Sequence, residues 1–272
     1  MPHKNAAGFR SIVWRYYRAH GRHDLPWRKT HDLYKILVSE VMLQQTQVER
    51  VILFYKNFIK KFPTAHALAR APLQEVLLGW QGLGYNRRAK LLREAAQNLV
   101  TTASFSTRSN LVKELEALPG VGPYTARAVA AFAFNQNTVF IETNIRTAVI
   151  HHFFSDKNTS IYGSISDADI TKVLQRASPK GRAREWYSAL MDYGAYLKRS
   201  GVRLNTKSKH YSKQSKFEGS PRQVRGAILK ALTTGVLLAS VKKEFPDRFA
   251  TALSGLERDG LIKKKGRGWT IA

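Results

Sequence analysis

The stretch LEALPGVGPYTARAVAAFAFNQNTVFIETNIR, from Leu115 to Arg146, decides the fold of this chain. It places a Gly-x-Gly turn, Gly120 to Gly122, before an apolar pattern that predicts a helix from Ala126 to Phe134. Such a turn at a helix start exposes successive backbone N–H groups, which can hold a phosphate without reading base sequence. A carboxylate, Glu142, comes two residues before Asn144. Tight turns alone also need glycine, so the prediction depends on the turn, the helix and the Glu-x-Asn pair together.

The composition indicates a folded protein with a polyanionic partner. The chain has 272 residues, a formal net charge of +26 and 43% hydrophobic residues. This length allows one large domain or two smaller ones. Because the hydrophobic content suffices for a core, the charge belongs to a folded surface and not to a disordered polycation. Nucleic acid is the first candidate partner, and the alternatives are a surface that charge keeps soluble or one that binds acidic lipid.

The chain contains no cysteine. Disulfides, thiolate catalysis, cysteine zinc sites and cysteine-held iron–sulfur clusters are therefore excluded, and we expect no metal and no cofactor. No apolar run approaches the roughly 20 residues of a membrane span, and the N-terminus lacks the apolar core of a signal peptide. We expect a monomer without membrane contact that works in the cytoplasm, in association with nucleoid DNA.

Helical periodicity extends to about residue 195. Apolar residues recur at three- and four-residue spacing in Ile36–Phe58, Leu73–Leu99, Leu111–Leu118 and Ala126–Phe134. Short Gly and Pro breaks separate these segments, for example at Gly82–Gly84, and strand-like alternation is scarce. The pattern predicts an all-α core over residues 1–197.

A basic linker is predicted at residues 198–219, because lysines and arginines crowd there with few apolar residues. We expect it to be extended or disordered unless it lies along DNA. Its basic residues are Lys198, Arg199, Arg203, Lys207, Lys209, Lys213 and Lys216.

Residues 220–272 predict a small second domain. Helical patterns at Arg222–Leu232, Leu237–Phe245 and Phe249–Arg258 precede two short strands, Leu261 to Ile271, around a basic glycine turn. Three helices and a basic hairpin resemble a winged helix, whose third helix can enter a major groove. The basic hairpin favours DNA binding over a helical cap that only packs on the core, through Lys263, Lys264, Lys265 and Arg267.

Glu40 is a candidate catalytic acid on physical grounds. It lies in ILVSEVML, residues 36–43, an otherwise apolar helical pattern in which acids are rare. Burial raises the pKa of a carboxyl group, and an acid that stays protonated near neutral pH can donate a proton to a leaving group. The structural alternative is a glutamate on a polar face or one paired with arginine.

Four motifs occur in order along the chain: LPWR (25–28), SEVMLQQTQV (39–48), GLGYNRRAK (82–90) and LPGVGPYTA (118–126). Together with the Glu-x-Asn pair they resemble the MutY-type adenine DNA glycosylases of the helix-hairpin-helix superfamily. The likeness covers most of residues 25–195, and SEVMLQQTQV is its most specific part. It implies a two-lobed helical glycosylase core that acts on double-stranded DNA with a mispaired or damaged base. The implied reaction is excision of adenine opposite 8-oxoguanine or guanine.

The resemblance also implies catalytic roles. Glu40 would protonate the purine, and Glu142 would stabilise the oxocarbenium-like sugar, a division of labour that parallels glycoside hydrolysis. Asn144 would position water or Glu142, and Tyr124 would lie beside the reacting sugar. Asp192 matches a further acidic position near the site, although a helix-capping or salt-bridged aspartate is an equal alternative.

The same likeness implies how the target base leaves the duplex. Gln45 and Tyr85 match wedge residues, an amide that inserts at the lesion and an aromatic ring that stacks between bases. A surface glutamine and a core tyrosine are the structural alternatives. Further expected DNA contacts in the motifs are Thr46, Arg87, Gly120 and Gly122.

Several features depart from the family pattern. Related glycosylases that cut the strand carry a lysine at position 124, which forms a Schiff base, so Tyr124 predicts a monofunctional enzyme. The adenine enzymes usually carry serine there, and tyrosine matches the mismatch thymine glycosylases. Glu142 replaces the usual aspartate, and the four-cysteine iron–sulfur loop and the 8-oxoguanine-recognising C-terminal domain are missing. The alternatives are therefore a glycosylase for mispaired thymine, uracil or another damaged base, and a DNA-binding protein without catalysis.

Overall fold

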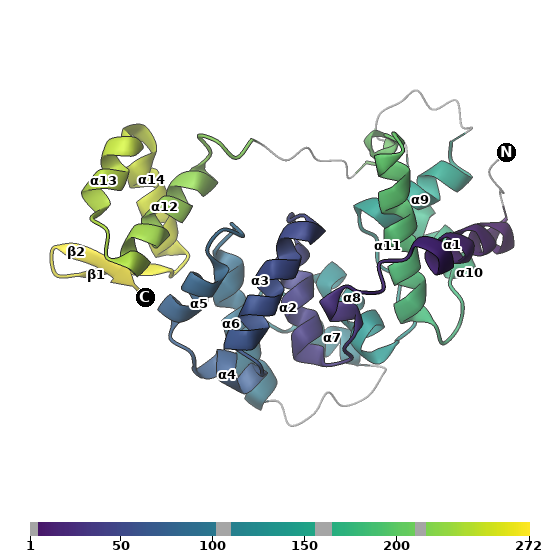
Figure 1. The fold of residues 1–272 in the computed structure, drawn as a ribbon, viewed down its shortest axis with the longest axis horizontal. Coiled ribbons are helices and arrows are strands. Elements are labelled where there is room, and N and C mark those ends of the chain that lie inside the picture. Colours follow the sequence, from purple (N-terminus) through teal and green to yellow (C-terminus); the bar gives the residue numbers. More distant parts are fainter. Residues whose placement is uncertain (1–4, 102–109, 156–164, 210–215) are drawn as a thin grey trace. The chain divides into compact units, whose positions relative to one another are not determined.

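A computed structural model of the chain describes residues 5–101, 110–155, 165–209 and 216–272. Its secondary structure is almost entirely helical (Figure 1), which confirms the predicted all-α class. The helices are α1 Ala6–His20, α2 Leu33–Leu43, α3 Val48–Lys61, α4 Ala65–Arg70, α5 Leu73–Trp80, α6 Arg87–Thr101, α7 Leu111–Glu116, α8 Pro123–Phe134, α9 Thr143–Phe153, α10 Asp167–Ala177, α11 Ala183–Arg199, α12 Pro221–Thr234, α13 Leu238–Glu244 and α14 Pro246–Arg258. The strands are β1 Ile262–Lys265 and β2 Gly268–Ile271.

The chain forms two compact units and crosses between them more than once. Unit 1 is made from residues 1–36, 107–115 and 122–213, and unit 2 from residues 37–106, 116–121 and 214–272. The boundaries predicted for a core, a linker and a C-terminal domain stay predictions. Each unit has its own packing and is described by itself.

Unit 1 is organised around α11. This helix packs against α9, α1 and α8, and its Trp186 is completely buried. The ring of Phe9 on α1 meets Trp186 edge-on, with 6.0 Å between the ring centroids. Burial of such large aromatic side chains is the main stabilising term of a helical core, at about 25 cal/mol for each Å² of apolar surface.

Unit 2 has a second aromatic core among α3, α5 and α6. Trp80 on α5 is fully buried, and the ring of Phe58 on α3 lies edge-on to it at 5.8 Å. The Nε of Arg93 on α6 donates to the backbone oxygen of Ala71 at 2.6 Å. This hydrogen bond ties α6 to the end of α4.

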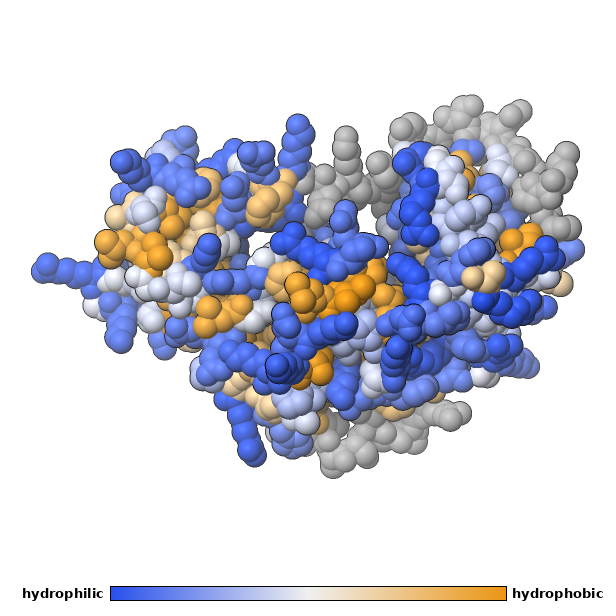
Figure 2. Space-filling view, viewed as in Figure 1, coloured by the Kyte–Doolittle hydropathy of each residue, from blue (hydrophilic) through white to orange (hydrophobic). Residues whose placement is uncertain are grey.

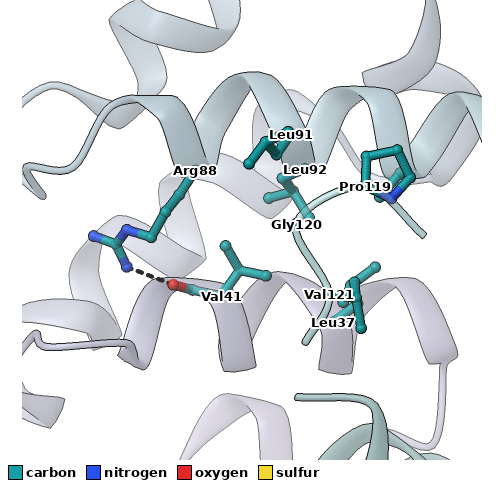
Figure 3. Close-up of a pocket in the computed structure, with 9 residues that line it drawn as sticks. Leu37, Val41, Arg88, Leu91, Leu92, Pro119, Gly120 and Val121 are labelled. Atoms are coloured by element: carbon teal, nitrogen blue, oxygen red, sulfur yellow. Dashed lines mark hydrogen bonds between the residues drawn. The ribbon is translucent and has the colours of Figure 1, made fainter. Parts of the chain in front are cut away.

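The Gly-x-Gly turn packs on α2 and α6. Figure 3 shows Gly120 and its neighbours facing Leu37 and Val41 of α2 and Leu91 of α6. Gly120 has a φ of +75°, and a Cβ atom there would lie 2.7 Å from the Leu91 Cβ. Both the backbone conformation and the close approach require glycine at this position. The space that these residues leave is apolar and only about 20 Å³, so it is a packing gap and not a ligand site.

The C-terminal residues have the predicted order of three helices and a hairpin. Helices α12, α13 and α14 precede β1 and β2, which pair antiparallel from Ile262 opposite Ile271 to Lys265 opposite Gly268. The two isoleucines are buried, whereas the lysines of β1 are exposed. The hairpin therefore attaches by its isoleucines and presents its basic side chains outward.

The first part of the linker is folded, which corrects the expectation of an extended or disordered segment. Helix α11 continues through Arg199, and residues 205–207 form a short 3₁₀ turn. Ser208 is buried, pairs with Ile165 and accepts a hydrogen bond from Arg146 at 2.8 Å. Specific contacts with distant residues fix this segment, and charge composition does not reveal them. Residues 210–215, which include Lys213, lie outside the described residues.

The breaks between helices in unit 2 are sharp. The helical pattern over Ile36–Phe58 is two helices, α2 and α3, and the break predicted near Gly82–Gly84 separates α5 from α6. Gln45 and Tyr85 lie in these breaks with φ values of +56° and +48°. Few residues other than glycine adopt this left-handed conformation, and it often marks functional positions. Apolar spacing continues across the first break, so periodicity does not reveal it.

Candidate functional site

Glu142 is the N-cap of α9. Its Oε1 accepts hydrogen bonds from the backbone N–H groups of Asn144 and Ile145, both at 2.8 Å, and the Thr143 hydroxyl donates to Oε2 at 3.1 Å. A carboxylate at a helix N-terminus is favoured by the exposed N–H groups and by the helix dipole. The structure thus joins Glu142 to Asn144 and holds the carboxylate in one place.

Helix α11 positions the start of α9. A Cβ atom on Gly194 would lie 2.0 Å from the backbone oxygen of Asn144, so only glycine permits this approach. One turn further along α11, Lys198 Nζ donates to Asn144 Oδ1 at 2.9 Å. Sequence reasoning missed both residues as parts of the site. The glycine in MDYGAY is the sequence signal for Gly194, and Lys198 lies in the segment that the sequence predicts as a linker.

Tyr124 lies in the first turn of α8, directly after the turn that ends at Gly122. Its half-buried ring meets Phe140 edge-on, with 5.7 Å between the centroids, and Phe140 stacks on Tyr187 at 4.0 Å. These three aromatic residues line an open cavity of about 780 Å³ in unit 1. Glu142 and Asn144 are not among the described residues that line it. The role of Tyr124 beside a sugar stays a prediction.

Asp192 is a buried salt-bridged residue. It is 2% exposed, and it accepts hydrogen bonds from the Arg22 backbone N–H at 2.8 Å and the Arg22 Nε at 2.6 Å. Arg28 adds two more, from Nη1 at 2.6 Å and from Nη2 at 3.0 Å. Burial by itself would raise the pKa of Asp192, but the hydrogen bonds and charges of Arg28 and Arg22 outweigh it and lower the pKa. The geometry supports the salt-bridged alternative, and it explains the arginine of LPWR.

We predict that Asp192→Asn destabilises the fold. The change leaves two guanidinium groups without their carboxylate, which costs about 3–5 kcal/mol when a buried pair is broken. Because the folded-state pKa of Asp192 is lowered, its contribution is present above the unfolded pKa of about 3.9 and is lost as the pH falls through the lower folded value. Urea unfolding between pH 3 and 7 measures both effects.

The control for this prediction is Asp24→Asn. The Asp24 side chain is 99% exposed and pairs with Lys29 at 3.1 Å, a geometry that contributes little to stability. Equal free energies of unfolding for the two variants would show that the Asp192 network is not stabilising.

Glu40 lies in α2 and is 5% exposed, between Ser39 and Val41, which are also buried. This burial agrees with the environment predicted for a general acid. Glu40 belongs to unit 2, whereas Glu142 belongs to unit 1.

Arg88 connects the turns that carry Gln45 and Tyr85. Its Nη1 donates to the backbone oxygens of Val41 and Gln44, the second at 2.9 Å, and its Nη2 donates to that of Gly84 at 3.1 Å (Figure 3 draws the bond to Val41). Burial lowers the pKa of Arg88 to about 10, so the group stays protonated at neutral pH. The sequence motif predicts a DNA contact for the neighbouring Arg87, whose side chain is 63% exposed, and it does not predict the contacts of Arg88.

The remaining predicted DNA contacts lie on the surface or at turns. The Thr46 hydroxyl donates to the Gln44 backbone oxygen at 3.3 Å, and Gly122 is exposed as the N-cap of α8. Figure 2 shows many hydrophilic side chains on one face of the molecule, with apolar patches between them. No helix within the described ranges is long and apolar enough to cross a membrane. The exposed hairpin side chains are Lys263, Lys264, Lys265 and Arg267.

We predict that these four hairpin side chains contact phosphates. Each contact contributes about 0.9 to the slope of log affinity against log salt concentration. Replacing all four by glutamine should flatten the slope by about 3.6 for every duplex. A double change of the exposed Lys56 and Lys60 on α3 to glutamine serves as the control. An unchanged slope in the hairpin variant would assign the hairpin to packing or to protein contacts.

The iron–sulfur cluster that is usual in the family this chain resembles does not fit this chain. Such a cluster needs four thiolate ligands, and the chain has no cysteine. Among the described residues there is also no group of three or more His, Asp or Glu side chains placed to hold a metal ion. The segment after α11 instead contains Ser208, which pairs with Ile165 and accepts a hydrogen bond from Arg146.

Comparisons with known proteins support the family that the four sequence motifs indicate. The chain is 34% identical to the adenine DNA glycosylase of Mycolicibacterium smegmatis, over 92% of this chain and 91% of that protein. It is 40% identical to the human adenine DNA glycosylase, over 69% of this chain but only 35% of that longer protein. The solved structure of a thermostable thymine-DNA glycosylase matches with a TM-score of 0.61 and 25% identity, over 76% of this chain and 96% of that one. A family model described as HhH-GPD superfamily base excision DNA repair protein matches residues 38–176. The chain therefore belongs to the HhH-GPD superfamily of base excision DNA repair proteins.

Proposed function

We propose that this protein is a monofunctional DNA glycosylase that excises adenine mispaired with 8-oxoguanine or guanine. Similarity over nearly the whole chain to an adenine DNA glycosylase supports the reaction. The observation that carries the proposal is the buried Glu40 within SEVMLQQTQV, because a buried carboxylic acid suits the protonation of a purine. The enzyme acts as a monomer on nucleoid DNA in the cytoplasm and uses no iron–sulfur cluster.

The reaction follows from two carboxyl groups with different surroundings. The adenine leaves the duplex, and Glu40 donates its proton to a ring nitrogen of the base. The N-glycosidic bond then breaks, its electron pair leaves with the base, and the sugar becomes an oxocarbenium-like cation. The Glu142 carboxylate accepts hydrogen bonds from two backbone N–H groups at the start of α9. Its negative charge stabilises this cation. Water adds to the anomeric carbon and releases a proton to the solvent, and the products are free adenine and an abasic site.

The absence of lyase chemistry rests on Tyr124, because a phenol cannot form a Schiff base. We predict that borohydride traps no covalent complex between the wild-type protein and lesion DNA. Lys198 is the amine to test if trapping does occur, since its Nζ lies 2.9 Å from Asn144 Oδ1. Trapping that Lys198→Arg abolishes would refute the monofunctional proposal and identify the nucleophile.

A second candidate target is mispaired thymine. Tyr124 stands where the resemblance places the tyrosine of mismatch thymine glycosylases, and the structural match to a thymine-DNA glycosylase is in agreement. The acid Glu40 favours adenine, because a purine is activated by protonation before it leaves.

One experiment separates these functions. The purified protein is incubated with duplexes that carry adenine, thymine or uracil opposite each of guanine, 8-oxoguanine and cytosine, and hot alkali then cleaves any abasic strand. We expect cleavage of the adenine strand opposite 8-oxoguanine and guanine. Cleavage confined to thymine or uracil would replace the adenine proposal, and no cleavage of any duplex would favour a DNA-binding protein without catalysis.

A further inference from the structure

Lys198 lies in the last turn of α11, in the stretch that the sequence predicts as a basic linker. The residue is half-buried, and its Nζ donates to Asn144 Oδ1 at 2.9 Å. Ordering a long lysine side chain costs conformational entropy, which offsets much of what one partly exposed hydrogen bond contributes to stability. The contact is therefore better explained by its effect on Asn144 than by the stability of the fold.

The backbone of α11 holds Lys198 against Asn144. Gly194 and Lys198 are four residues apart, so they lie on one face of the helix. Gly194 approaches so closely that a Cβ atom there would lie 2.0 Å from the Asn144 backbone oxygen. After Lys198 the helix ends in a turn, in which Arg203 Nη1 donates to the Lys198 backbone oxygen at 2.5 Å. The lysine side chain thus starts from a fixed point.

Two buried contacts fix α11 relative to its neighbours. The Asp192 carboxylate accepts hydrogen bonds from Arg22 and Arg28. The Tyr193 hydroxyl shares a hydrogen bond of 2.8 Å with Nε2 of His152 on α9. Both residues directly precede Gly194, so the helix cannot shift without breaking buried polar contacts, which are costly to leave unmade. Lys198 therefore meets Asn144 in a preorganised arrangement.

The contact with Lys198 decides which way the Asn144 amide points. An ammonium group only donates hydrogen bonds, so the amide oxygen faces Lys198 and the amide NH2 group is left for other partners. The Asn144 backbone N–H donates to Glu142 Oε1 at 2.8 Å, which keeps the residue beside the carboxylate. Asn144 therefore serves the reaction as a donor, through Nδ2.

The Glu142 carboxylate has little need of this donor. Its Oε1 accepts from two backbone N–H groups and its Oε2 accepts from the Thr143 hydroxyl, so three donors already hold it. Hydrolysis also needs a water molecule that is held where the sugar cation develops. A donor to the oxygen of this water fixes its position and leaves a lone pair free for attack.

We propose that Lys198 is a positioning residue, which orients the Asn144 amide so that Nδ2 donates to the attacking water. Lys198 does not touch the substrate and acts only through Asn144. This role rests on the proposed function, because that function places the reacting sugar beside Glu142. A sugar cation that water does not capture recombines with the base, so capture enters the net rate of excision whichever base leaves.

The test is a single-turnover measurement on the duplex that the alkali assay finds to be cleaved fastest. Lys198→Met keeps an unbranched side chain of similar length but cannot donate, and we expect it to lower the excision rate about tenfold. Its affinity for the same duplex should be unchanged. Lys198→Arg restores a donor at this position and should recover most of the rate.

A double-mutant cycle shows whether Lys198 acts through Asn144. Asn144→Ala removes the amide and should lower the excision rate by itself. In this background Lys198→Met should have no further effect, because the group that Lys198 orients is gone. A merely structural role of Lys198 would lower the rate by the same factor in both backgrounds.

The matched control is Lys172→Met. Lys172 is an exposed lysine of α10 in the same unit, and its replacement removes one positive charge without touching Asn144. This variant should keep the wild-type rate. Melting temperatures equal to that of the wild-type protein confirm that each variant is folded.

Several outcomes would overturn the positioning role. A wild-type excision rate in Lys198→Met would remove it, and equal rate losses in the two backgrounds of the cycle would assign Lys198 to the fold. Weaker affinity with a flatter salt dependence at an unchanged rate would assign it to a phosphate contact. Borohydride trapping that Lys198→Arg abolishes would make it a nucleophile. Failure of the proposed function shows separately, because the wild-type protein would then cleave no duplex before any variant is compared.

Discussion

Glu40→Gln is expected to lower the rate of adenine excision by about 100-fold or more while the protein still binds lesion DNA. Glutamine keeps the size and the hydrogen-bonding atoms of glutamate but cannot supply a proton, and general acid catalysis contributes about 10²- to 10⁴-fold. Because Glu40 is 5% exposed, a neutral amide costs no more to bury than the acid does, so the fold should be retained. Single-turnover excision and equilibrium binding are measured on the same duplex.

The matched control for this prediction is Glu49→Gln. Glu49 is an exposed glutamate in the first turn of α3, nine residues after Glu40. It should leave excision and binding unchanged. Full activity in the Glu40 variant would show that another group donates the proton, and it would remove the observation that carries the adenine proposal.

The sequence predicted the elements whose signals are local. The apolar spacing gave the helices, and the alternation around Gly266 gave the hairpin whose buried ends are Ile262 and Ile271. The apolar surroundings of Glu40 likewise predicted its burial. In each case the residues that determine the structure lie within a few positions of one another.

Long-range contacts could not be predicted in this way. The partners of Asp192 lie 164 and 170 residues away in the chain, so no spacing rule connects them. The close approach of Gly194 to Asn144 likewise joins two helices whose packing only the structure shows. The folded half of the linker is a third example, because its charge concealed the buried contact between Ser208 and Arg146.

The strained turns are a different case. Gln45 and Tyr85 have a left-handed backbone conformation, which such residues rarely adopt. Arg88 stabilises both turns by donating hydrogen bonds to their backbone oxygens, and the sequence does not reveal these bonds. Motif resemblance singled out Gln45 and Tyr85, whereas physical reasoning from the sequence alone had no basis for choosing them. The structure adds a reason, because local consistency is most often broken at functional sites.

Glu142→Gln should lower excision by about 100- to 1,000-fold, because a neutral amide cannot stabilise a developing cation as a carboxylate does. The amide oxygen of glutamine can still accept from the N–H groups of Asn144 and Ile145, so the α9 cap is largely kept. Glu142→Ala removes both the charge and the cap, and it should lose excision together with about 1 kcal/mol of stability. Glu142→Asp keeps the charge on a shorter side chain and should retain measurable activity.

The control for the lost cap is Ser166→Ala. Ser166 caps α10 in the same unit, accepting from the Asp169 backbone N–H at 3.2 Å, and it carries no charge. It should lose similar stability and keep full excision, which separates the cost of a missing cap from the loss of a carboxylate. All variants are compared under single-turnover conditions on the best lesion duplex, so that slow product release does not hide the chemical step. If Glu142→Gln is as active as the wild-type protein, the charge at this position has no part in the reaction and Glu142 serves only to begin α9.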